Sequence, residues 1–197
     1  MKEIIVATKN PGKAKEFKAF FSRFNIKCKS LLDIAPDYED VPETGATFQE
    51  NAIIKAKAAS DYFKSPVIAD DSGLVIDALD GKPGIETARF AGEDKNDDAN
   101  MNKVLRLMKD VEDDGRTARF IAALAIQFPM GKTIVREGTC EGKIARSKQG
   151  TEGFGYDPIF IPDGFDVTMA ELSSEQKSKI SHRNDAFRQL RKELLDI

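Results

Sequence analysis

Short apolar runs alternate with helical patterns in the first half of the chain. Ile4–Ala7 and Val67–Ala69 are β-branched apolar runs of the kind that form buried strands. Between them, phenylalanines recur at helical spacing from Phe17 to Phe24, and a second apolar stripe runs from Phe48 to Phe63. Ile26 to Leu32 resembles a short edge strand. The pattern predicts strands that alternate with amphipathic helices.

The second half of the chain is richer in strand patterns. Arg116 to Phe128 predicts a long strand, with Lys132 to Thr139, continued by Cys140 to Ala145, as its hairpin partner. A helix capped by Asn96 or Asp97 precedes them. Combined with the alternation before it, this half predicts an α/β fold with a mixed sheet rather than a purely parallel one.

Two adjacent carboxylates, Asp70 and Asp71, follow the run Val67–Ala69 and precede a second apolar run that begins at Leu74. Successive strand side chains point to opposite faces, so we expect one aspartate on the core side and the other in an open cleft. Two acids at a buried strand end require a positive partner, first of all a divalent metal and next a lysine. The alternative is a plain turn, because Asp-Asp-Ser-Gly has good turn composition.

The turn after the first strand is suited to an anion. Asn10 is expected to cap the following helix and Pro11 to occupy its first position. Backbone N–H groups and the helix dipole there favour phosphate, and Lys13 adds a cation. The spacing is not that of a Walker A loop. The alternative is an ordinary capped connection with a solvated lysine.

An acidic loop ends in Pro42-Glu43-Thr44-Gly45, directly before the second helix. Thr47 and Glu50 have the spacing of a capping box at the start of that helix. Glu43 is a candidate metal ligand. Lys55, farther along the helix, belongs either to the same site or to the solvent-facing side.

Residues 150–158, Gly-Thr-Glu-Gly-Phe-Gly-Tyr-Asp-Pro, form a loop in which the backbone can approach something flat. Phe154 or Tyr156 can stack on a base, and Asp157 can accept from a ring N–H. The alternative is an aromatic-lined turn that packs on its own strand.

The sole histidine, His182, precedes Arg183 in the first turn of the last helix, which Ser181 is expected to cap. A helix N-terminus disfavours cations, so this pair indicates a negative or carbonyl-rich partner. Lys177 lies in a short helix just before it, opened by a second capping box. The alternative is a surface pair with no partner.

Length and composition fit one soluble globular domain over residues 1–197, with room for two lobes. The net charge of −3 argues against nucleic-acid binding as the main activity. Cys28 and Cys140 lack metal-binding spacing and indicate reduced thiols. No apolar run reaches membrane length and no leader is visible, so we expect a cytoplasmic protein with neither a nucleic-acid nor a membrane partner.

Together these segments resemble the signature series of the inosine triphosphatase family, in order and over nearly the whole chain. The matching motifs are Thr8–Lys13, Glu43–Gly45, Glu50–Ala52, Ala69–Leu74, Gly153–Pro158, Ala170–Leu172 and Lys179–Arg183. The resemblance implies an elongated, mixed central sheet flanked by helices, with two lobes around a nucleotide cleft. It further implies a homodimer that hydrolyses ITP, dITP and XTP to the monophosphate and pyrophosphate with Mg²⁺.

The resemblance also implies residue roles. Thr8, Asn10 and Lys13, within a turn completed by Lys9, Pro11 and Gly12, would hold triphosphate oxygens. Asp71 would be the general base and a Mg²⁺ ligand, Glu43 the other acidic ligand, and Ser72 a substrate contact. The family's acidic doublet before Thr-Gly is incomplete here, because Pro42 fills its first place.

For the base, the resemblance implies that Phe154 stacks on the purine ring. Gly155, Tyr156 and Asp157 would complete the wall, while Lys177, His182 and Arg183 would contact the base edge. Two other hypotheses stand beside this one: a related pyrophosphatase with another base preference, and a nucleotide-binding module without turnover. The acid pair argues against the module, because carboxylates near phosphate weaken the binding of a polyanion.

Overall fold

The computed structural model describes residues 2–129 and 131–195. Within these residues, six strands form a sheet in the order β2-β1-β3-β4-β5-β6. The strands are β1 (Glu3–Val6), β2 (Lys27–Ser30), β3 (Val67–Ile76), β4 (Thr117–Gln127), β5 (Thr133–Ile144) and β6 (Phe160–Pro162). Because β1 is parallel to β2 and β3, whereas β5 and β6 are antiparallel, the sheet is mixed, as predicted.

The chain divides into two compact units. The first comprises Met1–Asp71, Ala122–Gly138 and Ala186–Ile197, and the second comprises Ser72–Ile121 and Thr139–Asp185. The boundaries fall inside β3, β4, β5 and α6 (His182–Leu195), so each of these elements contributes residues to both units.

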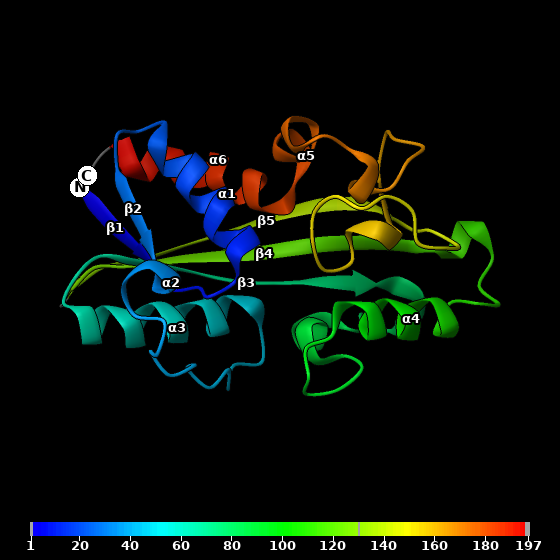
Figure 1. The fold of residues 1–197 in the computed structure, drawn as a ribbon, viewed down its shortest axis with the longest axis horizontal. Helices are drawn as coiled ribbons and strands as arrows, with labels where there is room; N and C mark the ends of the chain where they lie inside the picture. The colour runs from blue at the N-terminus through cyan, green and yellow to red at the C-terminus, as the bar shows by residue number, and fades with distance from the viewer. Residues whose placement is uncertain (1, 130, 196–197) are drawn as a thin grey trace. The chain divides into compact units, whose positions relative to one another are not determined.

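In the first unit, α1 (Pro11–Ser22) and α6 (His182–Leu195) lie on one face of the strands, and α3 (Phe48–Phe63) lies on the other (Figure 1). α1 turns its phenylalanine stripe to the core, where the rings of Phe17 and Phe187 meet edge to face at 5.1 Å and those of Phe20 and Phe187 stack at 3.9 Å. Asn10 caps α1 and Pro11 begins it, as predicted. These ring contacts hold α1 against α6.

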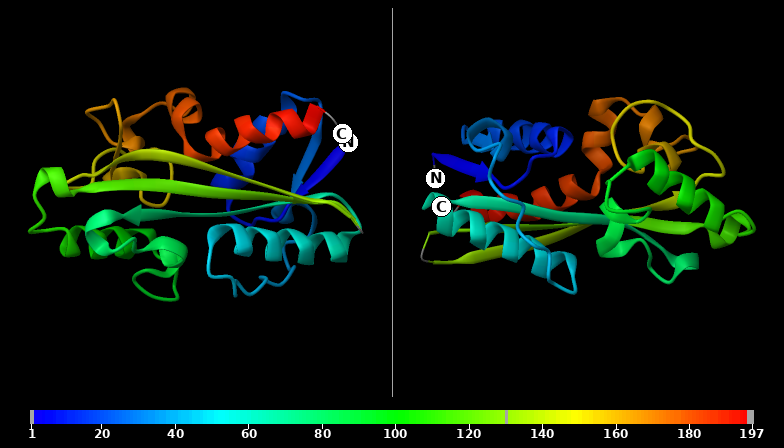
Figure 2. Two further views of the ribbon diagram at one scale, coloured as in Figure 1. Left: turned by 180° about the vertical axis from the view of Figure 1, so that it is seen from behind. Right: turned by 60° about the horizontal axis from the view of Figure 1, so that its bottom comes forward.

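The second unit contains α4 (Asp97–Leu107) and α5 (Ser174–Ile180), which lie on opposite faces of its strands (Figure 2). Short 3₁₀ segments connect the other elements: η1 (Asp77–Leu79), η2 (Gly84–Arg89), η3 (Asp113–Gly115), η4 (Asp157–Ile159) and η5 (Met169–Glu171). Buried Arg116 secures this unit by donating to the main-chain oxygens of Ile144 at 2.8 Å, Ala145 at 2.9 Å and Met108 at 2.6 Å.

The predicted edge strand ends earlier than expected. β2 stops at Ser30, and α2 (Leu31–Ile34) follows it directly. The reason is local: Asp33 Oδ2 accepts both the backbone N–H and the hydroxyl of Ser30 at 2.8 Å, which starts a helical turn.

The acid pair does not form a turn. β3 runs unbroken from Val67 to Ile76 through Asp70 and Asp71, so the second apolar run, which begins at Leu74, continues the same strand up to η1. Each carboxylate has a lysine partner within reach while the backbone stays extended, so the strand need not bend to expose them. Over the described residues, no helix is long and apolar enough to cross a membrane.

Candidate active site

Asp70 is paired with the lysine of the first helix. Lys13 Nζ lies 2.5 Å from Asp70 Oδ2, and the aspartate side chain is only 1% exposed. Lys13 reaches it because Asn10 caps α1: its Oδ1 accepts the Lys13 N–H at 3.0 Å, and its own N–H donates to Thr8 Oγ1 at 3.1 Å. The predicted phosphate turn is therefore ordered by its own polar groups, and Lys13 is not a solvated lysine.

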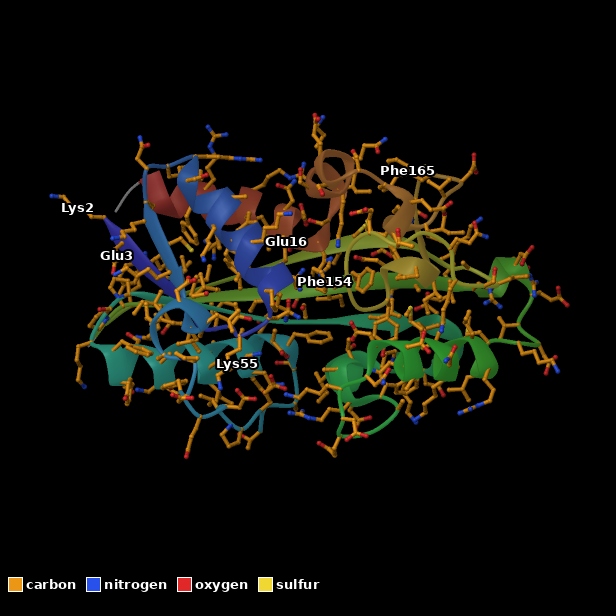
Figure 3. The ribbon with its side chains drawn as sticks, viewed as in Figure 1. Lys2, Glu3, Glu16, Lys55, Phe154 and Phe165 are labelled. Carbon is orange, nitrogen blue, oxygen red and sulfur yellow. The ribbon has the colours of Figure 1, made fainter. Side chains whose placement is uncertain are left out.

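Asp71 faces α3, as strand alternation requires. Lys55 Nζ donates to Asp71 Oδ1 at 2.8 Å and to Glu43 Oε1 at 3.0 Å, so one ammonium joins the two acids predicted to bind metal. Lys55, labelled in Figure 3, thus extends from α3 to β3. Sequence left Lys55 undecided, and the structure pairs it with Asp71 and Glu43 rather than with solvent.

Asn51 completes the surroundings of Asp71. Its Nδ2 donates to Asp71 Oδ2 at 3.3 Å, and its Oδ1 accepts the Gly45 N–H at 2.8 Å. The capping box opens α3 in a modified form. Thr47 caps the helix through the Glu50 N–H, whereas the Glu50 carboxylate accepts from Ala46 at 2.7 Å.

The electrostatics of this cluster follow from burial and opposed charges. Burial raises the pKa of Asp71, and the nearby Glu43 and Asp70 raise it further, which outweighs the lowering by Lys55. Burial lowers the pKa of Lys55, but the carboxylates of Asp71 and Glu43 outweigh it, so the pKa is raised overall. The lysine is therefore a stable cation beside an unusually basic carboxylate.

The glycine-rich loop places Phe154 beside cations of the second unit. Lys177 Nζ lies 4.5 Å from the centre of the Phe154 ring, and Arg183 Cζ lies 5.5 Å from it. Phe154 is labelled in Figure 3. Asp157 Oδ2 accepts from the Phe154 N–H at 2.9 Å and from Lys177 Nζ at 2.5 Å. The predicted base-binding residues Phe154, Asp157, Lys177 and Arg183 thus form one cluster.

His182 and Arg183 are buried, at 7% and 3% exposure, which excludes a pair on the open surface. His182 stacks on Phe120 at 5.0 Å, and Arg183 donates to Ser72 Oγ at 2.8 Å. Ser181 caps α6 by accepting the Asn184 N–H at 3.2 Å, as predicted.

Tyr156 is buried, and its hydroxyl contacts a segment outside the glycine-rich loop. It is 3% exposed, and its hydroxyl donates to the Thr87 carbonyl at 2.7 Å. Burial raises the pKa of Tyr156, so this donor stays protonated. The hydroxyl anchors the loop to η2, and Gly155 anchors it to α4 through its N–H, which donates to Asp97 at 3.0 Å.

Sequence reasoning assigned no hydrogen-bond partner to Asn51 and did not identify Lys13 as the partner of Asp70. An asparagine in the middle of the apolar stripe of α3 was the available signal, because a buried amide requires hydrogen-bond partners. Among the described residues, no three histidine, cysteine or acidic side chains gather as a metal cage. Glu43 and Asp71 each form an ion pair with the ammonium of Lys55.

Comparison with known proteins places this geometry in a family. The model of the Ham1 family matches residues 4–193. The dITP/XTP pyrophosphatase of Oceanobacillus iheyensis is 58% identical over 197 residues, which cover 100% of both chains. That of Listeria monocytogenes is 48% identical and covers 100% of this chain and 97% of its own.

Solved structures agree with the sequence relatives. The Ham1 protein of Staphylococcus aureus has a TM-score of 0.87 at 45% identity, with 99% of each chain covered. A HAM1 protein from Coxiella burnetii has a TM-score of 0.89 at 38% identity, with 100% of each covered. The resemblance carried by the motifs is therefore confirmed, and the chain belongs to the Ham1 family.

Proposed function

We propose that this protein hydrolyses non-standard purine nucleoside triphosphates, ITP, dITP and XTP, to the monophosphate and pyrophosphate. The observation that carries the proposal is the arrangement at β3. There a buried carboxylate of raised pKa, Asp71, is fixed by two donors and shares an ammonium with a second acid, Glu43. A binding module gains nothing from such an acid, whereas a hydrolase needs one to activate water.

The polyphosphate is assigned to the start of α1. Backbone N–H groups, the helix dipole and Lys13 favour phosphate there, within the turn Thr8–Lys13. Asn10 takes the Lys13 N–H, and Asp70 takes the Lys13 ammonium. Bound phosphate oxygens would therefore take the places of Asn10 Oδ1 and Asp70 Oδ2 as acceptors of these two donors.

The residues present suit a divalent cation, which we take to be Mg²⁺. Mg²⁺ is commonly held by one or two carboxylates together with substrate phosphates, and Glu43 and Asp71 supply that donor set. When bound, the ion would offset the charge that develops on the phosphate oxygens. Lys55 bridges the same two acids, so ammonium and metal would compete for them.

In the proposed hydrolysis step, the chain's own residues accept one proton and stabilise the leaving group. Asp71 accepts a proton from a water molecule, and the water oxygen forms a bond to the α-phosphorus. The bond from that phosphorus to the oxygen bridging to the β-phosphate breaks, and pyrophosphate leaves with this oxygen. Lys13 and the N–H groups of α1 stabilise its negative charge, so positioning and electrostatics supply most of the acceleration.

The purine ring of the substrate is assigned to the cluster of Phe154, Lys177 and Arg183 in the second unit. Phe154 would stack on the purine, while Lys177, His182 and Arg183 would donate to its carbonyl oxygens. An adenine amino group would leave buried donors unpaired, which can discriminate by roughly 10⁴-fold. Ser72 would contact the substrate, and Gly155, Tyr156 and Asp157 would form the wall, with Tyr156 acting mainly through its ring and backbone.

Several finer assignments complete the proposal. We assign residues 1–197 to one catalytic domain, the active protein is a homodimer, and it works in the cytoplasm, where nucleotide pools lie. The motif series supports these assignments.

The test is release of pyrophosphate, measured separately from orthophosphate, from ITP, dITP, XTP, ATP, GTP and UTP with Mg²⁺. We expect pyrophosphate from the first three and little from ATP. Equal turnover of UTP would favour another base preference. Binding of ITP without cleavage would mean that the protein is a binding module.

A further inference from the structure

A buried amide connects the loop that carries Glu43 to the carboxylate of Asp71. Asn51 is 1% exposed and lies in the buried stripe of α3, where Ala52 and Ala56 are its neighbours. A buried amide is costly unless it is hydrogen-bonded, so an apolar residue would be the ordinary occupant. Both ends of the Asn51 amide are engaged: Oδ1 with the Gly45 N–H and Nδ2 with Asp71 Oδ2.

Only one orientation of this amide satisfies both contacts. The Gly45 N–H is a donor and requires the amide oxygen, whereas an ionised Asp71 is purely an acceptor and requires the amide NH₂. The reverse orientation would oppose donor to donor and acceptor to acceptor. The contact with the loop therefore fixes the donor that is directed at Asp71.

Lys55 lies one helical turn after Asn51, on the same side of α3, and donates to the other oxygen of Asp71. The two carboxylate oxygens thus receive separate donors from one helix. Two donors to two oxygens fix the plane of the carboxylate, as well as its position.

Gly45 gives an independent sign that the loop must approach this amide closely. A Cβ at Gly45 would lie 2.6 Å from Glu50 Cβ and 2.8 Å from Asn51 Oδ1. Only a residue without a side chain lets the backbone donate to Asn51 at this place. The adjacent Ala46 N–H donates to Glu50, so the loop is bound to the start of α3 at two consecutive residues.

We propose that Asn51 is a positioning residue for hydrolysis, which couples the Glu43 loop to Asp71 and sets the direction of the Asp71 carboxylate oxygens. The proposal rests on the proposed function, because Asp71 is the base there. Asn51 acts through Asp71 and not on the substrate.

Asn51→Asp keeps the size of the side chain and an acceptor for the Gly45 N–H, but it removes the donor to Asp71 and adds a second carboxylate beside it. Asn51→Ser, which adds no charge, is therefore assayed with it. We expect kcat for ITP to fall about 10- to 100-fold, the usual effect of losing a hydrogen bond to a ligating side chain, while KM changes less than about 3-fold. Should Asn51→Asp fail to fold, Asn51→Ser carries the same expectation.

The chain offers a matched control in Asn100 of α4, which is also 1% exposed. Its Oδ1 accepts the Ala91 N–H at 2.6 Å and its Nδ2 donates to the Ala88 carbonyl at 3.0 Å. Asn100→Asp loses the equivalent donor, and we expect a similar loss of thermal stability with kcat unchanged. Equal losses of kcat in the two variants would reduce Asn51 to a structural role and overturn the inference.

A second readout needs no activity. Exchange of the Gly45 amide hydrogen should be slow in the wild-type protein and in Asn51→Asp, and fast in Asn51→Leu; rapid exchange in the wild type would overturn the inference. Asp71→Asn is assayed in parallel. Wild-type kcat in Asn51→Asp beside an inactive Asp71→Asn refutes the inference alone, whereas an active Asp71→Asn refutes the proposed function.

Discussion

At the scale of single residues, the site consists of buried acids that each have an ammonium partner. Asp70 is held by Lys13 and Asp71 by Lys55, from helices on opposite faces of the strand. Removing one partner of a buried pair leaves a buried charge whose solvation is not replaced, which costs about 3–5 kcal/mol. The charges that serve chemistry are thus also charges on which stability depends.

Asp71→Asn separates chemistry from binding. The amide keeps the shape of the side chain but cannot accept the proton of water, so we expect kcat for ITP to fall about 10²- to 10⁴-fold. Binding of ITP, followed by calorimetry, should survive. Turnover near that of the wild type would remove Asp71 from its role as base.

Lys13→Ala is expected to weaken triphosphate binding and to destabilise the protein, because Asp70 loses its ammonium. The double variant Lys13→Ala, Asp70→Asn removes both charges and should recover much of the stability in urea unfolding. Its KM for ITP should stay high, since the phosphate contact is still missing. Unchanged KM and kcat in Lys13→Ala would refute the assignment of the polyphosphate to α1.

At the scale of elements, α3 organises the surroundings of Asp71. It begins at the Thr47 cap, receives the Glu43 loop at its start, and presents Asn51 and Lys55 to β3. Helical spacing places these two side chains together, because residues four apart share a face.

Gly45→Ala should disturb this helix start, because the new Cβ would lie 2.6 Å from Glu50 Cβ. We expect kcat/KM for ITP to fall at least about 10-fold, since the Glu43 loop must move off α3. Gly131→Ala is the control in the same unit: among the described residues, its Cβ would meet only the Pro129 carbonyl, at 3.6 Å. Similar kinetics in both variants would contradict a role for the close approach of the loop.

The sequence predicted those elements whose signals are local. The caps at Asn10 and Ser181, the long β4 and the glycine-rich loop all follow from neighbouring residues. It did not predict that β3 continues through Asp70 and Asp71, because the lysines that permit this come from distant helices. The same holds for Tyr156, whose partner Thr87 is set by tertiary packing.

At the scale of the whole molecule, each unit holds one cysteine, Cys28 in the first and Cys140 in the second. Burial raises the pKa of each thiol to about 12, with the acids Asp33 near Cys28 and Asp163 near Cys140 adding to it. A thiol reacts as its thiolate, so a raised pKa suppresses reaction at neutral pH until the unit opens.

Thiol alkylation in urea therefore reports on each unit separately. Because β3, β4 and β5 supply residues to both units, we expect Cys28 and Cys140 to become reactive at the same urea midpoint. Cys28→Ser and Cys140→Ser assign the two signals. Labelling of one thiol well below the midpoint of the other would show that the units unfold independently.

The central claim is that water attacks the α-phosphorus and that pyrophosphate leaves, and turnover of ITP in oxygen-18 water tests it most directly. We predict that mass spectrometry will find the label in the inosine monophosphate and none in the pyrophosphate. Label in the pyrophosphate, or release of orthophosphate in its place, would contradict the account.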